Sequence, residues 1–146
     1  MKLPIETLQQ VHQMLNAIPF LKMLKQGEIE EMALSLNLRH YMKDETIIRQ
    51  GEPGKLFYLN FKGRVGVYRS KLFGKKQVAT IGAGEFFGEI ALIENVPRTA
   101  TVIGLEDGEM FTLARESFEK VLLANPGIAT VIRQISETRR AANQEA

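Results

Sequence analysis

The feature that most constrains the fold is a change of character along the chain. Between Leu38 and Leu113 the sequence consists of short runs of β-favouring residues separated by Gly, Asp and Asn turn signals. Many short, evenly spaced strands are typical of an antiparallel sandwich or jelly roll. The sequence predicts strands at residues 38–42, 46–49, 56–61, 64–70, 77–81, 99–103 and 110–114.

Helical patterns precede and follow these strands. Residues 5–18 and about 28–37 place their apolar residues on one face, as do residues 116–124 and a last helix from Pro126 to about Arg140. Asn125 is the expected N-cap of that last helix. We therefore predict one α+β domain over residues 1–146: an antiparallel β-roll or jelly roll (38–114) flanked by N-terminal helices (5–37) and two C-terminal helices (115–140).

Composition narrows the class of protein. The chain of 146 residues has no cysteine, which excludes disulfides and thiolate metal sites. No apolar run approaches the roughly 20 residues of a membrane-spanning helix, and no signal-peptide pattern follows the N-terminus. We expect a cytoplasmic protein that makes no contact with a membrane.

Charge is distributed unevenly. Residues 39–76 contain ten Lys or Arg and three Asp or Glu, whereas residues 85–119 contain two Arg and eight Asp or Glu. A basic stretch can bind nucleic acid. Its charges alternate with apolar residues, however, as on the solvent face of a sheet, so we expect no DNA contact.

Residues typical of catalytic centres are sparse. The two histidines, His12 and His40, lie far apart in sequence, and no nucleophile elbow, zinc-protease helix, EF-hand loop or P-loop is present. Residues 82–88 nearly match the glycine-rich dinucleotide motif, but the third glycine comes one residue late and the context is all β. We predict no enzyme, no catalytic residue and no bound metal.

Residues 84–102 carry the pattern that most directly indicates a function. Gly88 allows close approach to the backbone, and the helix-compatible run after it offers free N–H groups that suit an anion. Arg98 presents a planar guanidinium to phosphate oxygens, while Glu89 can only accept hydrogen bonds and suits a sugar hydroxyl. A ribose phosphate would satisfy both. An ordinary β–helix–β connection with a surface Arg and Glu explains the residues about equally well.

The segment as a whole resembles the phosphate-binding cassette of cyclic-nucleotide-binding domains. That cassette reads Phe-Gly-Glu-aliphatic-Ala-Leu, a short loop, then Pro-Arg-small-Ala-Thr-Val, and residues 87–102 fill every one of these positions. Residues from about 16 to 136 also match the family's layout. The resemblance implies a cAMP or cGMP sensor that needs no cofactor and signals by movement of its C-terminal lid helix.

The resemblance also implies roles for individual residues. Arg98 would pair with the cyclic phosphate, assisted by the N–H groups of Ala91 and Ala100, and Glu89 and Gly88 would hold the ribose 2′-hydroxyl. Thr99 would reach the phosphate or a guanine edge. Lid-helix residues would cover the base in place of the aromatic that many relatives use. The expected ligand-binding residues are Val78, Gly88, Glu89, Ile90, Ala91, Arg98, Thr99, Ala100 and Arg133.

Several alternatives stay open at this level. The chain could be a degenerate, non-binding β-roll that serves as a protein-interaction or dimerisation module. The apolar face of the last helix fits either a homodimer or docking on the roll, and the effector partner is unknown. We predict a preference for cAMP, with cGMP binding comparably or somewhat more weakly. Asn60 is expected to face outward from an otherwise apolar strand.

Overall fold

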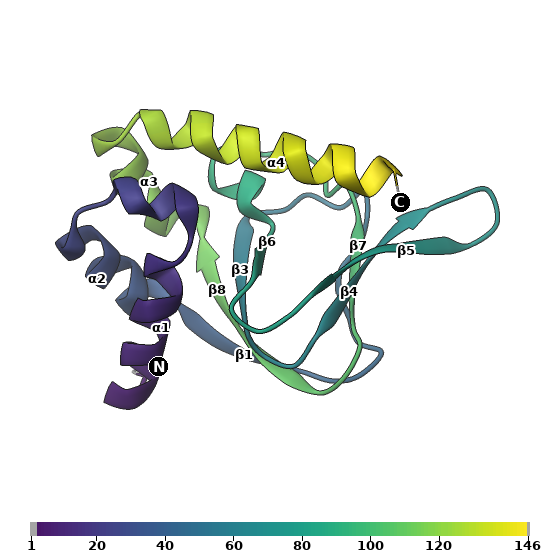
Figure 1. The fold of residues 1–146 in the computed structure, drawn as a ribbon, viewed down its shortest axis with the longest axis horizontal. Coiled ribbons are helices and arrows are strands. Elements are labelled where there is room, and N and C mark those ends of the chain that lie inside the picture. The colour runs from purple at the N-terminus through teal and green to yellow at the C-terminus, as the bar shows by residue number, and fades with distance from the viewer. Residues whose placement is uncertain (1–2, 146) are drawn as a thin grey trace.

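The computed structural model describes the backbone of residues 3–145 and the side chains of residues 3–141. Helices lie at both ends of the described chain, with strands between them (Figure 1). The helical elements are α1 (Ile5–Asn16), η1 (Pro19–Met23), α2 (Gln26–Ser35), η2 (Glu89–Leu92), α3 (Arg115–Ala124) and α4 (Gly127–Glu145), of which η1 and η2 are 3-10 helices. The strands are β1 (Asn37–Tyr41), β2 (Thr46–Ile48), β3 (Leu56–Lys62), β4 (Val65–Ser70), β5 (Lys75–Ile81), β6 (Phe86–Phe87), β7 (Thr101–Gly104) and β8 (Gly108–Ala114).

The strands form two antiparallel sheets. Their strand orders are β1-β8-β3-β6 and β2-β7-β4-β5. Apolar side chains from both sheets pack together in one cluster, in which Tyr58 and Met110 of the first sheet meet Val65, Val67 and Val102 of the second. This arrangement confirms the predicted α+β class and the antiparallel β-roll.

Strand β3 shows that the centre of the first sheet is buried on both faces. Phe57 and Leu59 belong to the apolar cluster shared with the helices, whereas Tyr58 belongs to the cluster between the sheets. Strand β8 alternates in the same way, with Phe111 facing the helices and Met110 facing the other sheet. Because successive strand residues point to opposite faces, burial on both faces requires a nearly continuous apolar run.

The outer face of the first sheet is covered by α1, η1, α2, α3 and the start of α4. Helix α4 continues beyond the other helices (Figure 1). Their apolar residues recur at three- and four-residue spacing, which places them on one side of each helix. The second half of α4 leaves this cluster and reaches η2 and β5. The fully buried side chains of this layer include Val11, Leu15, Phe20, Phe118, Ile128 and Ile132.

The predicted elements are all present, with shifted ends. Each of the seven predicted strands ends within two residues of its observed limits. The short strand β6 was not predicted, because its two residues cannot show an alternating pattern; it pairs with β3 through Tyr58–Phe87 and Leu59–Phe86. None of the helices in the described part of the chain is long and apolar enough to cross a membrane.

Two polar residues behave differently from the prediction. Asn60, expected to face outward, is fully buried. Its Oδ1 lies 2.9 Å from the Tyr41 hydroxyl, and its Nδ2 donates to the Gly63 carbonyl at 2.8 Å. Asn125, expected to cap α4, instead donates through Nδ2 to Glu28 of α2 and to the Val121 carbonyl of α3, each at 3.0 Å.

Candidate functional site

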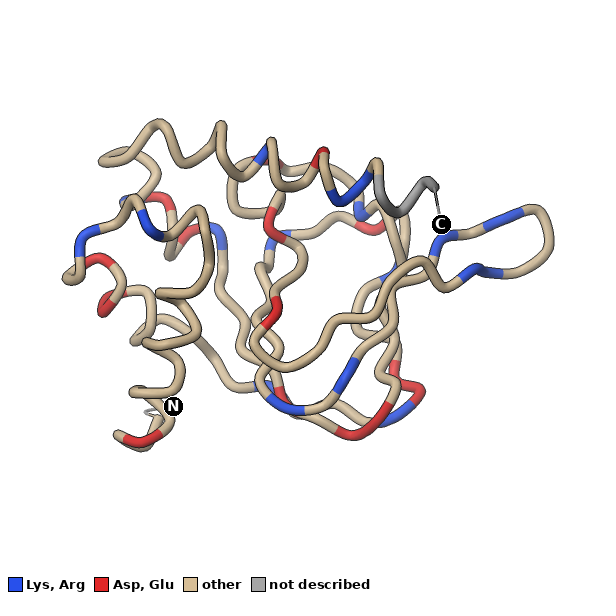
Figure 2. The backbone as a smooth tube through the Cα atoms, in the orientation of Figure 1, with Lys and Arg blue, Asp and Glu red and all other residues tan. Residues whose placement is uncertain are grey.

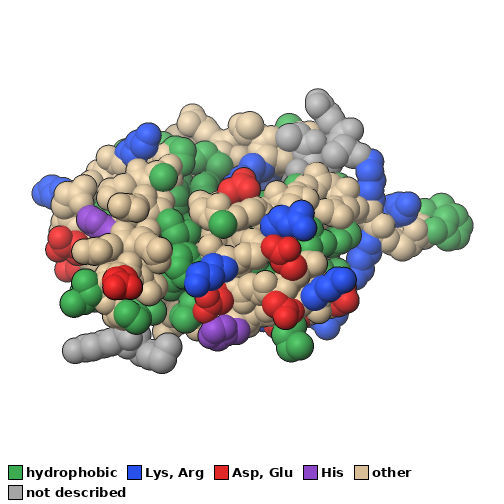
Figure 3. All heavy atoms as spheres, turned by 60° about the horizontal axis from the view of Figure 1, so that its bottom comes forward, with side chains coloured by type: hydrophobic (Ala, Val, Ile, Leu, Met, Phe, Trp, Pro, Cys, Tyr) green, Lys and Arg blue, Asp and Glu red, His purple; other side chains and the backbone are tan. Residues whose placement is uncertain are grey.

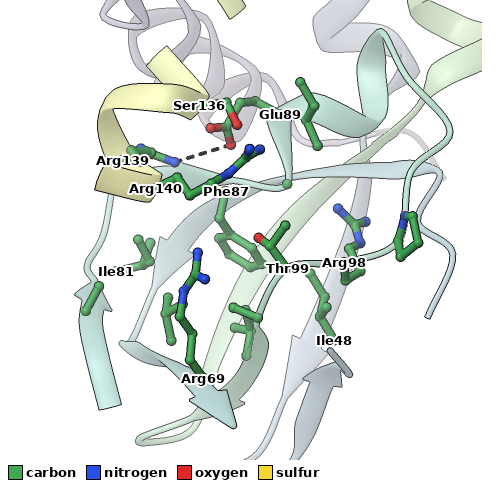
Figure 4. Close-up of a pocket in the computed structure, with 17 residues that line it drawn as sticks. Ile48, Arg69, Ile81, Phe87, Glu89, Arg98, Thr99, Ser136, Arg139 and Arg140 are labelled. Carbon is green, nitrogen blue, oxygen red and sulfur yellow. Dashed lines mark hydrogen bonds and ion pairs between the residues drawn. The ribbon is translucent and has the colours of Figure 1, made fainter. Parts of the chain in front are cut away.

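A pocket of about 170 Å³ lies between the second sheet and α4 (Figure 4). One wall comes from strands β2, β4, β5 and β7, a second from residues 87–90 and 97–100, and the cover from α4. The strand wall is formed by Ile48, Val67, Arg69, Ala79, Ile81 and Val102, and the cover by Ser136, Arg139 and Arg140.

Gly88 allows the chain to turn sharply at the pocket wall. Its backbone is left-handed, with φ 74° and ψ 20°, a conformation that residues with a side chain rarely adopt. A Cβ atom there would also lie 2.9 Å from Arg98 Nη1 and 3.1 Å from the Leu56 carbonyl oxygen. Residues 89–92 after it form a single 3-10 turn, in which the Ala91 N–H already donates to the Gly88 carbonyl at 3.2 Å.

Arg98 is held by backbone on both sides. Its N–H donates to the Glu52 carbonyl and its carbonyl accepts from the Gly51 N–H, each at 2.8 Å. Its Nη2 donates to the Leu56 carbonyl at 2.7 Å, and its guanidinium lies 5.7 Å from the centre of the Tyr58 ring. A Cβ at position 54 would overlap the guanidinium, so any larger residue there would displace the Arg98 side chain.

Arg98 forms no ion pair with a carboxylate of the described residues, although Glu89 lies near enough to act on its charge. None of the ion pairs among the described residues includes it. Burial lowers the pKa of the guanidinium, and the nearby Tyr58 and Glu89 offset part of that effect. Arginine stays protonated at neutral pH, so the pocket holds a half-buried positive charge with room for an anion.

Glu89 is a buried carboxylate that faces α4. The residue is 5% exposed, and its Oε2 lies 3.3 Å from Arg139 Nη1 (Figure 4). The Arg139 guanidinium also lies over the Phe86 ring, 4.2 Å from its centre. The end of α4 therefore covers this carboxylate and supplies its counter-charge.

The pocket brings together six of the nine predicted ligand-binding residues. These are Gly88, Glu89, Ile90, Arg98, Thr99 and Ala100. Ala91 is buried behind the wall. Arg133 of α4 does not line the pocket. Its Nε and Nη2 each lie 2.9 Å from Glu94 Oε1.

Val78 is not among the residues that line the pocket. Ile81 and Ala79 line it, whereas Val78 packs, partly buried, against the apolar cluster between the sheets. An irregularity in the pairing of β4 with β5 lies at this point: Val67 pairs with Ala79 and Tyr68 pairs with Gln77, so Val78 has no partner. Single-residue bulges leave no clear sequence signal.

Three arginines of the pocket were missed from the sequence. Arg69 follows Val65 and Val67 at two-residue spacing, which could have placed it on the inner face of β4. Its Nε is buried and has no hydrogen-bond partner among the described residues. Arg139 and Arg140 lie one turn and more beyond Ile135, where the apolar stripe of α4 ends. No group of three or more His, Asp or Glu among the described residues is placed to hold a metal.

Comparison with known families bears directly on this site. The family model described as cyclic nucleotide-binding domain matches residues 38–125, more than half of the chain and all of the segment that forms the second pocket wall. The chain belongs to the cyclic nucleotide-binding domain family. The resemblance read from residues 87–102 is thereby confirmed.

Individual relatives within the family bear different names. The chain is 33% identical over 114 residues to a cAMP-dependent protein kinase regulatory subunit from Colletotrichum orbiculare, covering 78% of this chain and 29% of that protein. It is 33% identical over 108 residues to human cGMP-dependent protein kinase 2, covering 74% of this chain and 14% of that protein. The chain thus spans less than a third of the length of these two relatives.

A solved structure of the family is similar over most of the chain. It is a mutant regulatory subunit of a cAMP-independent protein kinase A from Trypanosoma brucei, bound to cAMP in its A site. The two chains are 28% identical with a TM-score of 0.75, over 90% of this chain and 48% of that one.

Proposed function

We propose that this cyclic nucleotide-binding domain is a sensor that binds cAMP, and cGMP comparably or somewhat more weakly, and catalyses no reaction. The observation that carries the proposal is the charge of the pocket. Its described lining includes Arg69, Arg98, Arg139 and Arg140, with Glu89 as the single acidic residue. A recess lined mainly by one sign of charge attracts ligands of the opposite sign.

The cyclic phosphate is expected to bind at Arg98. The guanidinium is fixed at one edge by the Leu56 carbonyl, which leaves its remaining N–H groups for phosphate oxygens in a bidentate arrangement. The N–H of Ala91 is engaged within its own turn. The binding of this N–H group to the phosphate, which the family resemblance implies, would therefore need a small rearrangement of residues 88–91.

The ribose is expected to bind at Glu89. A carboxylate accepts a hydrogen bond from a hydroxyl and repels a phosphate. Arg139 lies against this carboxylate, so a ribose hydroxyl would compete with the arginine or share the carboxylate with it. The base would then lie along Val67, Ala79 and Ile81 on the strand wall.

Movement of α4 is the proposed signal. The pocket of about 170 Å³ is smaller than the roughly 300–1,000 Å³ of most small-molecule sites. Because α4 is the wall that comes from outside the roll, its displacement is the simplest way to enlarge the pocket. Ligand binding and helix position are then linked as a two-state equilibrium.

The alternative is a relative that keeps the fold without binding a cyclic nucleotide. One similar structure is the regulatory subunit of a Trypanosoma brucei kinase described as cAMP-independent, and the form bound to cAMP is a mutant. In this chain, however, Arg98 has no carboxylate partner among the described residues, and an unpaired half-buried charge is costly unless a ligand uses it. This favours the sensor.

Calorimetric titration of the chain with cAMP, cGMP and 5′-AMP tests the proposal. We expect saturable binding of the cyclic nucleotides and much weaker binding of 5′-AMP, whose open phosphate carries more charge and a different shape. A 2′-deoxy analogue of cAMP should bind more weakly than cAMP because it lacks the hydroxyl for Glu89. Absence of binding by both cyclic nucleotides would establish the non-binding alternative.

A further inference from the structure

The hairpin formed by β4 and β5 projects beyond the body of the molecule (Figure 1). At its end lie two adjacent large apolar side chains, Leu72 at 89% and Phe73 at 83% exposure. Leu72 is the most exposed large apolar residue of the described chain. The turn itself is closed by backbone, with the Lys71 N–H donating to the Gly74 carbonyl at 3.0 Å, so the fold does not need apolar side chains at these two positions.

Basic residues surround this apolar pair. Lys71, Lys75 and Lys76 are exposed and take part in none of the ion pairs of the described residues. No Asp or Glu occurs anywhere from residue 53 to residue 84. The positive residues flank the tip along both strands (Figure 2), and the apolar side chains extend past them (Figure 3).

We propose that the hairpin tip, residues 71–76, docks on a membrane surface rich in anionic phospholipid. Leu72 and Phe73 enter the boundary between headgroups and acyl chains, while Lys71, Lys75 and Lys76 remain behind them and contact phosphate and carboxylate headgroups. Peripheral attachment of this kind gains from buried apolar area and from attraction of basic residues to anionic lipids. The proposal replaces the expectation from the sequence that the chain makes no membrane contact.

A lipid surface fits this tip better than other polyanions. A nucleic acid would attract the lysines but offers no apolar layer for Leu72, and a protein partner would need a matching apolar pocket within an acidic surface. Exposed apolar residues rimmed by charge commonly mark interaction sites. In a protruding hairpin they reach a lipid surface without any preformed pocket on the partner. The proposal does not depend on which nucleotide the pocket binds.

Vesicle sedimentation tests the attachment. The wild-type chain should bind vesicles of phosphatidylcholine containing one-third phosphatidylserine, should bind pure phosphatidylcholine weakly, and should be released by salt. The double variant Leu72→Ser, Phe73→Ser and the double variant Lys75→Gln, Lys76→Gln should each lower the partition coefficient by about tenfold or more. The matched double variant Leu34→Ser, Leu123→Ser, which removes exposed leucines on α2 and α3, should bind as wild type.

Fluorescence tests the depth of insertion. The chain contains no tryptophan, so Phe73→Trp introduces a single probe at the tip and Leu123→Trp a control. Emission of the first should shift to shorter wavelength with anionic vesicles, and emission of the second should not. Equal binding to both vesicle types, wild-type binding by either hairpin variant, or the same shift with soluble DNA or polyglutamate would overturn the proposal.

Discussion

The two sheets of the roll are alike in strand number but differ in what surrounds them. The centre of the first sheet, β1-β8-β3-β6, is buried on both faces, and its buried amide, Asn60, has protein partners. The second sheet, β2-β7-β4-β5, lines the pocket with its inner face, and the buried Nε of Arg69 has no hydrogen-bond partner among the described residues. The comparison indicates that the first sheet mainly supplies stability, while the second mainly supplies ligand contacts. Substitutions in the two sheets should therefore have separable effects.

The largest effect is expected in the first sheet, from Phe57→Ala. Phe57 is buried and its ring packs against those of Phe20 and Phe86, at 6.1 and 5.8 Å between centres. Truncation should lower the free energy of unfolding by about 3–5 kcal/mol, measured by urea denaturation. Phe73→Ala, in the exposed turn between β4 and β5 of the second sheet, should change it by less than about 0.5 kcal/mol. Similar losses of unfolding free energy from both substitutions would show that the two sheets do not differ in their contribution to stability.

The next effect is expected in the pocket, from Arg98→Ala. Nucleotide binding should weaken by about 2–5 kcal/mol, because the phosphate loses its counter-charge, while the melting temperature without ligand should change little. Arg64→Ala serves as the control, since that residue is exposed and paired with Glu106. Calorimetry would contradict the assignment if Arg98→Ala binds within a few-fold of wild type.

Tyr41→Phe should affect stability without affecting binding. It leaves the buried Asn60 Oδ1 and the Lys62 carbonyl without the hydroxyl that lies within 2.9 Å of each. The expected loss of unfolding free energy is about 1–3 kcal/mol. Tyr68→Phe in β4 is the control, because no hydrogen bond of the Tyr68 hydroxyl is found among the described residues. A change in nucleotide affinity in the Tyr41 variant would show that the two sheets are coupled.

The same tyrosine gives a pH dependence with a defined sign. Burial raises the pKa of the Tyr41 hydroxyl above 10.0, and the hydrogen bond to Asn60 offsets part of the increase. A raised folded-state pKa contributes stability that is present below the unfolded value and is lost as the pH rises through the folded value. The unfolding free energy of the wild type should thus fall more steeply above about pH 10 than that of Tyr41→Phe. Parallel curves in urea titrations would rule this out.

The smallest effect is expected from Thr99→Ala in the pocket wall, which tests what the Thr99 hydroxyl binds. Its hydroxyl can serve a guanine edge or the phosphate. If it serves guanine, the substitution should weaken cGMP binding by about 1 kcal/mol more than cAMP binding. Titrating both nucleotides into both proteins measures this difference. An equal drop would assign the hydroxyl to the phosphate alone.

Features that depend on residues close together in the sequence could be predicted, whereas features that depend on contacts between distant residues could not. The segment 87–102 carries its information locally, so the family and the positions of Glu89 and Arg98 were within reach. Alternation also located seven strands. The burial of Asn60 could not be predicted, because it depends on Tyr41, 19 residues away.

The remainder of the pocket depends on packing between distant elements. Arg139 reaches the pocket only because α4 crosses the end of the roll, 50 residues along the chain from its partner Glu89. Ala79 lines the pocket where Val78 was expected to, next to one irregular pairing between β4 and β5. Local periodicity contains neither piece of information, since both arise when the sheets and the last helix are assembled.

Helix α4 has a mechanical consequence that follows from where it is attached. Ile128 and Ile132 near its start are fully buried, and Asn125 ties the preceding link to α2 and α3, so this end acts as a pivot. At ~1.5 Å per residue, Glu145 lies roughly 20 Å beyond Ile132, and a tilt of about 10° would displace it by about 3–4 Å. The helix would then act as a lever: breaking the ion pair between Glu89 and Arg139 would displace the far end of α4 by several ångströms.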